Sequence, residues 1–151
     1  MASAQSLTGG CACSRIRFTA QVPEDAQCYL CHCRMCQRAS GNVSLAMVGL
    51  PQANVRWSHE PDWYDSSAIA QRPFCATCGT SLGFRYREGT DKMDLTVAAF
   101  DDPSGFKPSS HFGAESMNRA WLNTDGLPET RSDEYQPLQE RWAAAESAVS
   151  S

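Results

Sequence analysis

Residues 28–36 read CYLCHCRMC and place four of the chain's eight cysteines within nine residues, with His32 in the middle. The other four form two pairs, one in residues 11–13 (CAC) and one in residues 75–78 (CATC). Cysteines spaced in this way form disulfides, carry out redox chemistry or bind a metal. Which of these applies decides both the fold and the chemistry of the chain.

The length and the first residues favour reduced thiols over disulfides. At 151 residues the chain fits one domain, which we expect to cover residues 1–151. Residues 1–10 (MASAQSLTGG) have neither the basic start nor the apolar run of a secretory signal, and no apolar stretch approaches the roughly 18 residues of a membrane helix. We therefore expect a soluble, cytoplasmic protein, because that compartment keeps thiols reduced.

Charge and composition exclude one class of partner. The net charge is −4, and the 13 lysines and arginines are scattered rather than gathered into a run. Nucleic acid binding relies on a basic patch or stripe, which this sequence lacks. We expect no nucleic acid partner and no membrane partner, and the sequence does not indicate an oligomeric state.

Alternating apolar and polar residues predict a mainly β fold. In RIRFTAQV (15–22) the apolar residues fall on one side of an extended chain, which is typical of a half-buried strand. Further strands are predicted over residues 44–50, 54–59, 62–66, 81–86 and 93–100. A short helix is predicted over 34–40, because Gly41 follows it, and a C-terminal helix over 138–149, with a Pro, Gly and Ser loop over 101–110.

Two cysteine pairs from distant parts of the chain can close a tetrahedral thiolate site. Cys11 and Cys13 would join Cys75 and Cys78 in a structural zinc site that staples the fold. A thioredoxin-like role for the CATC pair is disfavoured, because its flanks read as strands rather than as a βαβ unit.

The remaining cysteines leave two arrangements open. Either Cys31, Cys33 and Cys36 supply three ligands to a second zinc, or Cys28 joins them and closes the site. We favour three ligands, with Cys28 as a small buried hydrophobe, because four ligands within nine residues require a very tight wrap. Three ligands would leave a position for a substrate, and three thiolates suit thiol chemistry better than water activation.

The histidines near these motifs have less specific roles. His32 lies between two candidate ligands and is expected to point away from their metal, as a hydrogen-bonding neighbour. His111, in KPSSHFG, is a general base or an ordinary loop histidine, and the sequence shows no partner for it.

Four motifs in order resemble the glutathione-dependent formaldehyde-activating enzyme family, which includes the centromere protein V-like domains. They are GGCACSRIRF, CHCRMCQRASG, YDSSAIAQRPFCATCGTSL and WLNTDGLP, which together span about residues 8–128. The resemblance implies a β-tent (Mss4-like) zinc-binding fold with short helices and two zinc ions per chain. It places the structural zinc on Cys11, Cys13, Cys75 and Cys78, and the second zinc on Cys31, Cys33 and Cys36. Ser14 stands where the family often has glycine.

The same resemblance implies an activity. Members are named for joining glutathione to formaldehyde, which formally makes them carbon-sulfur lyases running in reverse. We therefore expect a zinc-dependent lyase or synthase that acts on a glutathione or other small thiol adduct of a small aldehyde, with Cys31, Cys33 and Cys36 as its catalytic ligands. Two alternatives remain: a non-catalytic zinc module that binds a protein partner, and a zinc-thiolate redox sensor.

Overall fold

The structure is a computed structural model, and it describes residues 3–149. These residues fall into two compact units, the first ending at Asn118 and the second beginning at Arg119. All eight cysteines belong to the first unit. The single domain expected over residues 1–151 stays a prediction.

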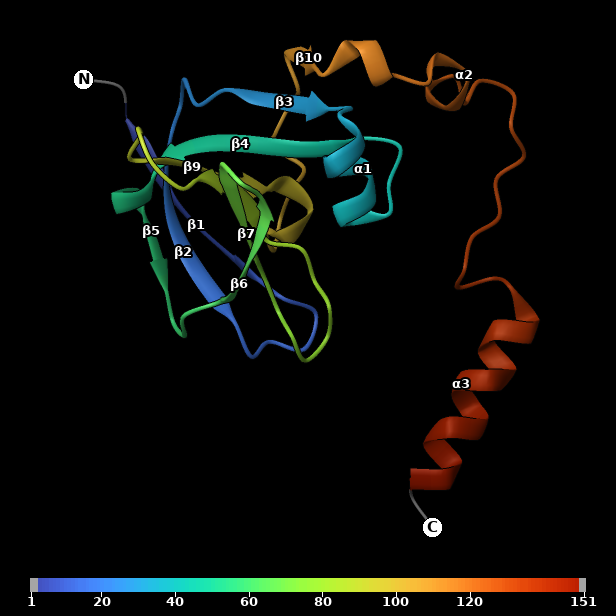
Figure 1. The fold of residues 1–151 in the computed structure, drawn as a ribbon. Helices are drawn as coiled ribbons and strands as arrows, with labels where there is room; N and C mark the ends of the chain where they lie inside the picture. Colours follow the sequence, from blue (N-terminus) through green and yellow to red (C-terminus); the bar gives the residue numbers. More distant parts are fainter. Residues whose placement is uncertain (1–2, 150–151) are drawn as a thin grey trace. The chain divides into compact units, whose positions relative to one another are not determined.

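Two β-sheets make up most of the first unit, which confirms the mainly β prediction (Figure 1). The smaller sheet has the order β1-β2-β5, with β1 (Ala4–Gly10), β2 (Arg17–Pro23) and β5 (Val55–Trp57). The larger has the order β10-β3-β4-β9-β8-β7-β6, with β3 (Cys28–Cys31), β4 (Leu45–Pro51), β6 (Asp62–Ser67), β7 (Ala70–Phe74), β8 (Gly83–Tyr86), β9 (Lys92–Thr96) and β10 (Ser110–Phe112). All neighbouring strands in it pair antiparallel except β10 and β3, which are parallel.

The hydrophobic core draws on both sheets. Alternate residues from Ile16 to Val22 are buried, as the period-two pattern predicts, and the opposite face of β2 is more exposed. They belong to the same core cluster as buried residues of the larger sheet, among them Val48 of β4 and Leu95 of β9. This core fixes the smaller sheet against the larger one. The cysteine groups lie at the ends of strands of both sheets.

The helix predicted over residues 34–40 is confirmed, whereas part of one predicted strand is a 3-10 turn instead. Helix α1 (Arg34–Ser40) has the predicted bounds, and Gly41 ends it with a φ of 67°, a left-handed conformation that glycine adopts at little cost. The strand predicted over 93–100 is wrong beyond Thr96, where the 3-10 turn η2 (Val97–Ala99) begins. Two further 3-10 turns are η1 (Gln52–Asn54) and η3 (Ala114–Ser116).

The second unit contains α2 (Arg119–Leu122) and α3 (Gln136–Val149). Helix α3 confirms the predicted C-terminal helix, although it begins two residues earlier. Neither helix buries a residue. Within residues 3–149, no helix has the length and apolar character needed to cross a membrane.

Gly9 allows β1 to lie close to the segment around Ala99 and Phe100, and its replacement by alanine should destabilise the first unit. Gly9 forms an isolated antiparallel bridge with Phe100, and a Cβ atom there would lie 2.8 Å from the Phe100 Cα atom and closer still to the Ala99 carbonyl and the Phe18 ring. We expect Gly9→Ala to lower the free energy of unfolding by about 2 to 3 kcal/mol, as overpacking typically does. Urea denaturation would measure it, with Gly105→Ala, which has open space around it, as the control.

Candidate metal centres

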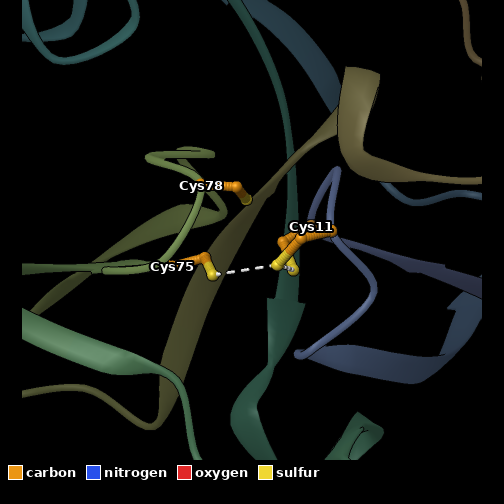
Figure 2. Close-up of side chains that lie close together, drawn as sticks. Cys11, Cys75 and Cys78 are labelled. Carbon is orange, nitrogen blue, oxygen red and sulfur yellow. Dashed lines mark hydrogen bonds between the residues drawn. The ribbon is translucent and has the colours of Figure 1, made fainter. Parts of the chain in front are cut away.

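Two turns bring together the cysteines of the four-cysteine cluster, which are Cys11, Cys13, Cys75 and Cys78. Cys11 and Cys13 lie in the turn from β1 to β2, and the CATC pair follows β7. The four Sγ atoms all lie within 4.8 Å of one another, with 3.6 Å from Cys11 to Cys13 and 3.7 Å from Cys13 to Cys75. Figure 2 shows the side chain of Cys11 facing those of Cys75 and Cys78 from opposite turns.

Each of the two turns contains a residue with a left-handed backbone conformation. Ser14 has a φ of 63° and donates its backbone N–H to the Cys11 carbonyl at 3.0 Å. Gly79 has a φ of 80° and donates to the Cys75 carbonyl at 2.7 Å. Among the described residues other than glycine, Ser14 alone has a positive φ. That conformation gives a physical reason for the glycine often found at this position in the resembling family.

The spacing of the sulfurs fits a tetrahedral zinc ion. Zinc–sulfur bonds of about 2.3 Å in tetrahedral geometry separate the sulfurs by about 3.8 Å. The sulfur pairs of the four-cysteine cluster, at 3.6 and 3.7 Å, lie close to that value. The two buried thiols, Cys11 and Cys75, also explain how such an ion would be shielded from solvent on one side.

The other cluster contains three sulfurs. Cys31 ends β3, Cys33 caps the N-terminus of α1, and Cys36 lies in the first turn of that helix. The Cys31 and Cys33 Sγ atoms are 3.5 Å apart, and Cys33 Sγ accepts the Cys36 backbone N–H at 3.3 Å. All three Sγ atoms lie within 4.8 Å of one another. The cap therefore aims a helix N-terminus, which favours negative charge, at the sulfurs.

Cys28 lies outside this cluster. It is buried in the main hydrophobic core, as expected of a small hydrophobe, at the start of β3. Within the part of the chain that the structure describes, no further Cys, His, Asp or Glu side chain joins the three-cysteine group. The structure thus groups three sulfurs without Cys28, and the assignment of these three as ligands of a zinc ion stays a prediction.

A buried arginine accompanies the three sulfurs. Arg72 of β7 donates from Nη2 to Cys36 Sγ at 3.3 Å, and its Cζ atom lies 5.1 Å from the centre of the Phe84 ring. The neighbouring Cys31 thiol and this guanidinium lower the pKa of Cys36 to about 5. The environment of Cys36 thus favours anionic sulfur, the form that binds a metal, whereas the hydrogen bond with Cys36 raises the pKa of Cys31.

His32 is fully buried and makes contacts away from the sulfur cluster. Its Nε2 atom lies 2.8 Å from Nδ1 of His111, and its backbone N–H donates to the Phe112 carbonyl at 2.8 Å. His32 is therefore a hydrogen-bonding neighbour, as expected. The partner of His111 was not visible in the sequence, because the parallel pairing of β10 with β3 brings together two histidines that lie 79 positions apart.

A cavity of about 310 Å³ opens beside the three sulfurs. Cys31, Cys33 and Cys36 form part of its wall, together with Arg72 and Asp94. Burial raises the pKa of the Asp94 carboxyl. A group of potential metal ligands next to a cavity of this size can bring a small molecule to the metal.

Comparison with known proteins identifies the class. Residues 6–116 match the sequence model of the glutathione-dependent formaldehyde-activating enzyme family, and the chain belongs to that family. The match confirms the resemblance and the Mss4-like fold class, and it ends before the WLNTDGLP motif at residues 121–128.

Two known proteins are similar to the chain, one in sequence and one in fold. A Schizosaccharomyces pombe protein named as an uncharacterized lyase is 32% identical over 92 residues, which cover 61% of this chain and 66% of the yeast protein. A Rhodobacter sphaeroides protein of known crystal structure is similar in fold, with a TM-score of 0.55 and 19% identity over 70% of this chain and 99% of its own.

Proposed function

We propose that this protein forms and breaks the carbon-sulfur bond between a small thiol, of which glutathione is the type, and a small aldehyde. The three-cysteine cluster beside a cavity carries this proposal. Cys31, Cys33 and Cys36 would hold the second zinc, at the active site, and the four-cysteine cluster would hold the structural zinc that staples the fold. Membership of the family and the lyase name of the yeast relative support the reaction class.

The reaction needs no oxidant or further substrate. The thiol sulfur bonds to the aldehyde carbon, and the thiol proton passes to the aldehyde oxygen; the reverse step breaks the carbon-sulfur bond and restores both reactants. A zinc ion held by Cys31, Cys33 and Cys36 would favour the ionised form of a substrate thiol. The chain orients those thiolates through the α1 cap and sets the buried positive charge of Arg72 beside them.

Replacing Cys33 by alanine should abolish the protein-dependent reaction. Uncatalysed addition of a thiol to formaldehyde is easy, so the rate is best measured at equilibrium by two-dimensional exchange NMR, with the spontaneous exchange subtracted. We expect Cys33→Ala to lower the protein-dependent rate roughly 100-fold or more, since loss of even a ligand's hydrogen-bond partner typically costs about 10 to 100-fold. The zinc content should fall from about two per chain to about one.

Cys28→Ala is the matched control, because it removes a buried thiol that belongs to neither sulfur cluster. It should keep about two zinc ions and the wild-type exchange rate. If zinc-loaded wild-type protein exchanges the adduct no faster than buffer does, the enzyme proposal is wrong, and a non-catalytic zinc module becomes the better account. Zinc release by mild peroxide would instead support a redox sensor.

A further inference from the structure

Exposed apolar side chains of the first unit gather around the cavity beside the three sulfurs. Five large hydrophobic residues in residues 3–118 are exposed, and four of them line this cavity: Met35, Ile69, Tyr86 and Phe112. The fifth, Tyr64, packs edge-on against Phe74 outside it, at 5.4 Å between ring centres. Exposed apolar side chains concentrated at one site indicate a binding surface.

Aromatic rings and a methionine continue this surface into the cavity. The Tyr29 and Phe112 rings meet edge to face at 6.3 Å, and the Phe84 and Tyr86 rings at 5.1 Å. Met47, which is buried, also lines the cavity. Edge-to-face rings and thioether sulfur are favourable neighbours for another aromatic ring.

The volume of the cavity is large for formaldehyde. Formaldehyde has two heavy atoms. For scale, a water molecule, with one heavy atom, occupies about 30 Å³ of the liquid. The cavity measures about 310 Å³, which is at the lower end of the range for pockets that hold drug-sized ligands. The one-carbon group of a formaldehyde adduct would by itself fill only a small part of this volume.

The charges of the cavity do not suit the peptide part of glutathione. That tripeptide carries two carboxylates. Among residues 3–149, Arg72 is the one cationic side chain in the cavity wall, and it is buried and directed to Cys36 and Phe84. The carboxyl of Asp94 faces the same cavity and would repel an anion when ionised. An uncharged group therefore fits the cavity better than the ends of glutathione do.

We propose that this cavity selects an aromatic aldehyde, so that the preferred adduct carries a benzene-sized ring on the carbon bonded to sulfur. This inference rests on the proposed function and specifies its substrate. The bond changes are those of any thiol addition: sulfur bonds to the aldehyde carbon, and the thiol proton passes to the aldehyde oxygen. The ring occupies the aromatic part of the cavity, and the charged parts of the thiol stay outside it.

Binding of two stable adduct analogues to the zinc-loaded protein tests this selection without turnover. S-benzylglutathione carries the ring, whereas S-methylglutathione stands for the formaldehyde adduct, and neither is cleaved. Isothermal titration calorimetry should show that the benzyl compound binds about tenfold or more tightly, because burying one ring contributes well over the 1.4 kcal/mol that a tenfold ratio needs.

Two tyrosine variants locate the preference. Tyr86→Ser removes a ring of the cavity wall and should abolish most of the benzyl preference, whereas Tyr64→Ser removes an exposed ring outside the cavity and should keep it. Equal affinity for the two analogues, or a preference that survives Tyr86→Ser and is lost in Tyr64→Ser, would overturn the inference.

Exchange NMR with glutathione and either benzaldehyde or formaldehyde separates this inference from the proposed function. Protein-dependent exchange of formaldehyde without a benzyl preference would support the function and overturn the aromatic selection. A benzyl preference without exchange of either aldehyde would support aromatic recognition by the cavity and overturn the lyase proposal.

Discussion

Cys75→Ala is expected to unfold the first unit under conditions in which the wild type is fully folded. Cys75 is completely buried, and its cluster joins the turn before β2 to the turn after β7. Zinc binding to such a site stabilises the folded state directly, with apparent free energies of about 10 to 16 kcal/mol in small zinc domains. That exceeds or matches the whole stability of a typical domain, about 5 to 15 kcal/mol.

Circular dichroism during thermal unfolding, combined with zinc analysis, would measure this effect. Cys28→Ala is again the control, since it removes a thiol from the same core without touching either cluster. We expect the control to keep two zinc ions and to lose little stability. A Cys75→Ala protein that binds two zinc ions and melts with the control would show that the four sulfurs do not staple the fold.

Local patterns explain why much of the fold was predictable from the sequence. The alternation in residues 15–22 depends on burial of one face of β2, and the end of α1 depends on the left-handed conformation of Gly41. Spacing likewise indicated the group of four cysteines, and the tight wrap that four ligands within nine residues would need favoured the group of three that the structure shows. Cys28 fell outside both because its side chain points into the core.

The elements that the sequence did not reveal depend on distant partners. β7 contains a buried arginine and Pro73, both of which argue against a strand in sequence, yet the strand pairs with β6 and the arginine meets Cys36. β10 lies at the end of a Pro, Gly and Ser loop and becomes a strand only by pairing with β3. The aromatic cavity was not predictable for the same reason, since its wall combines residues from seven strands and a helix.

The buried charge of Arg72 should strengthen zinc binding at the three-sulfur site, because it lies beside Cys36. Arg72 is 1% exposed, and its Nε and Nη1 atoms have no hydrogen-bond partner within residues 3–149. A charge buried in this way is costly unless an opposite charge lies beside it. Three thiolates with one zinc dication carry a net charge of −1, which the guanidinium next to Cys36 would neutralise.

Arg72→Met should therefore weaken zinc binding at the three-sulfur site by roughly 10 to 100-fold, the usual cost of losing a partner of a metal ligand. Stability without the second zinc should stay equal or rise, because replacing a buried charge by an apolar side chain is often neutral or stabilising. Competition with a chromogenic chelator measures the affinity, and Arg85→Met is the control, because Arg85 stacks on Trp63 at 3.6 Å instead. Arg72→Lys, which keeps the charge, should retain more zinc than Arg72→Met. Equal zinc affinity in the Arg72→Met and Arg85→Met proteins would show that the charge of Arg72 does not act on the site.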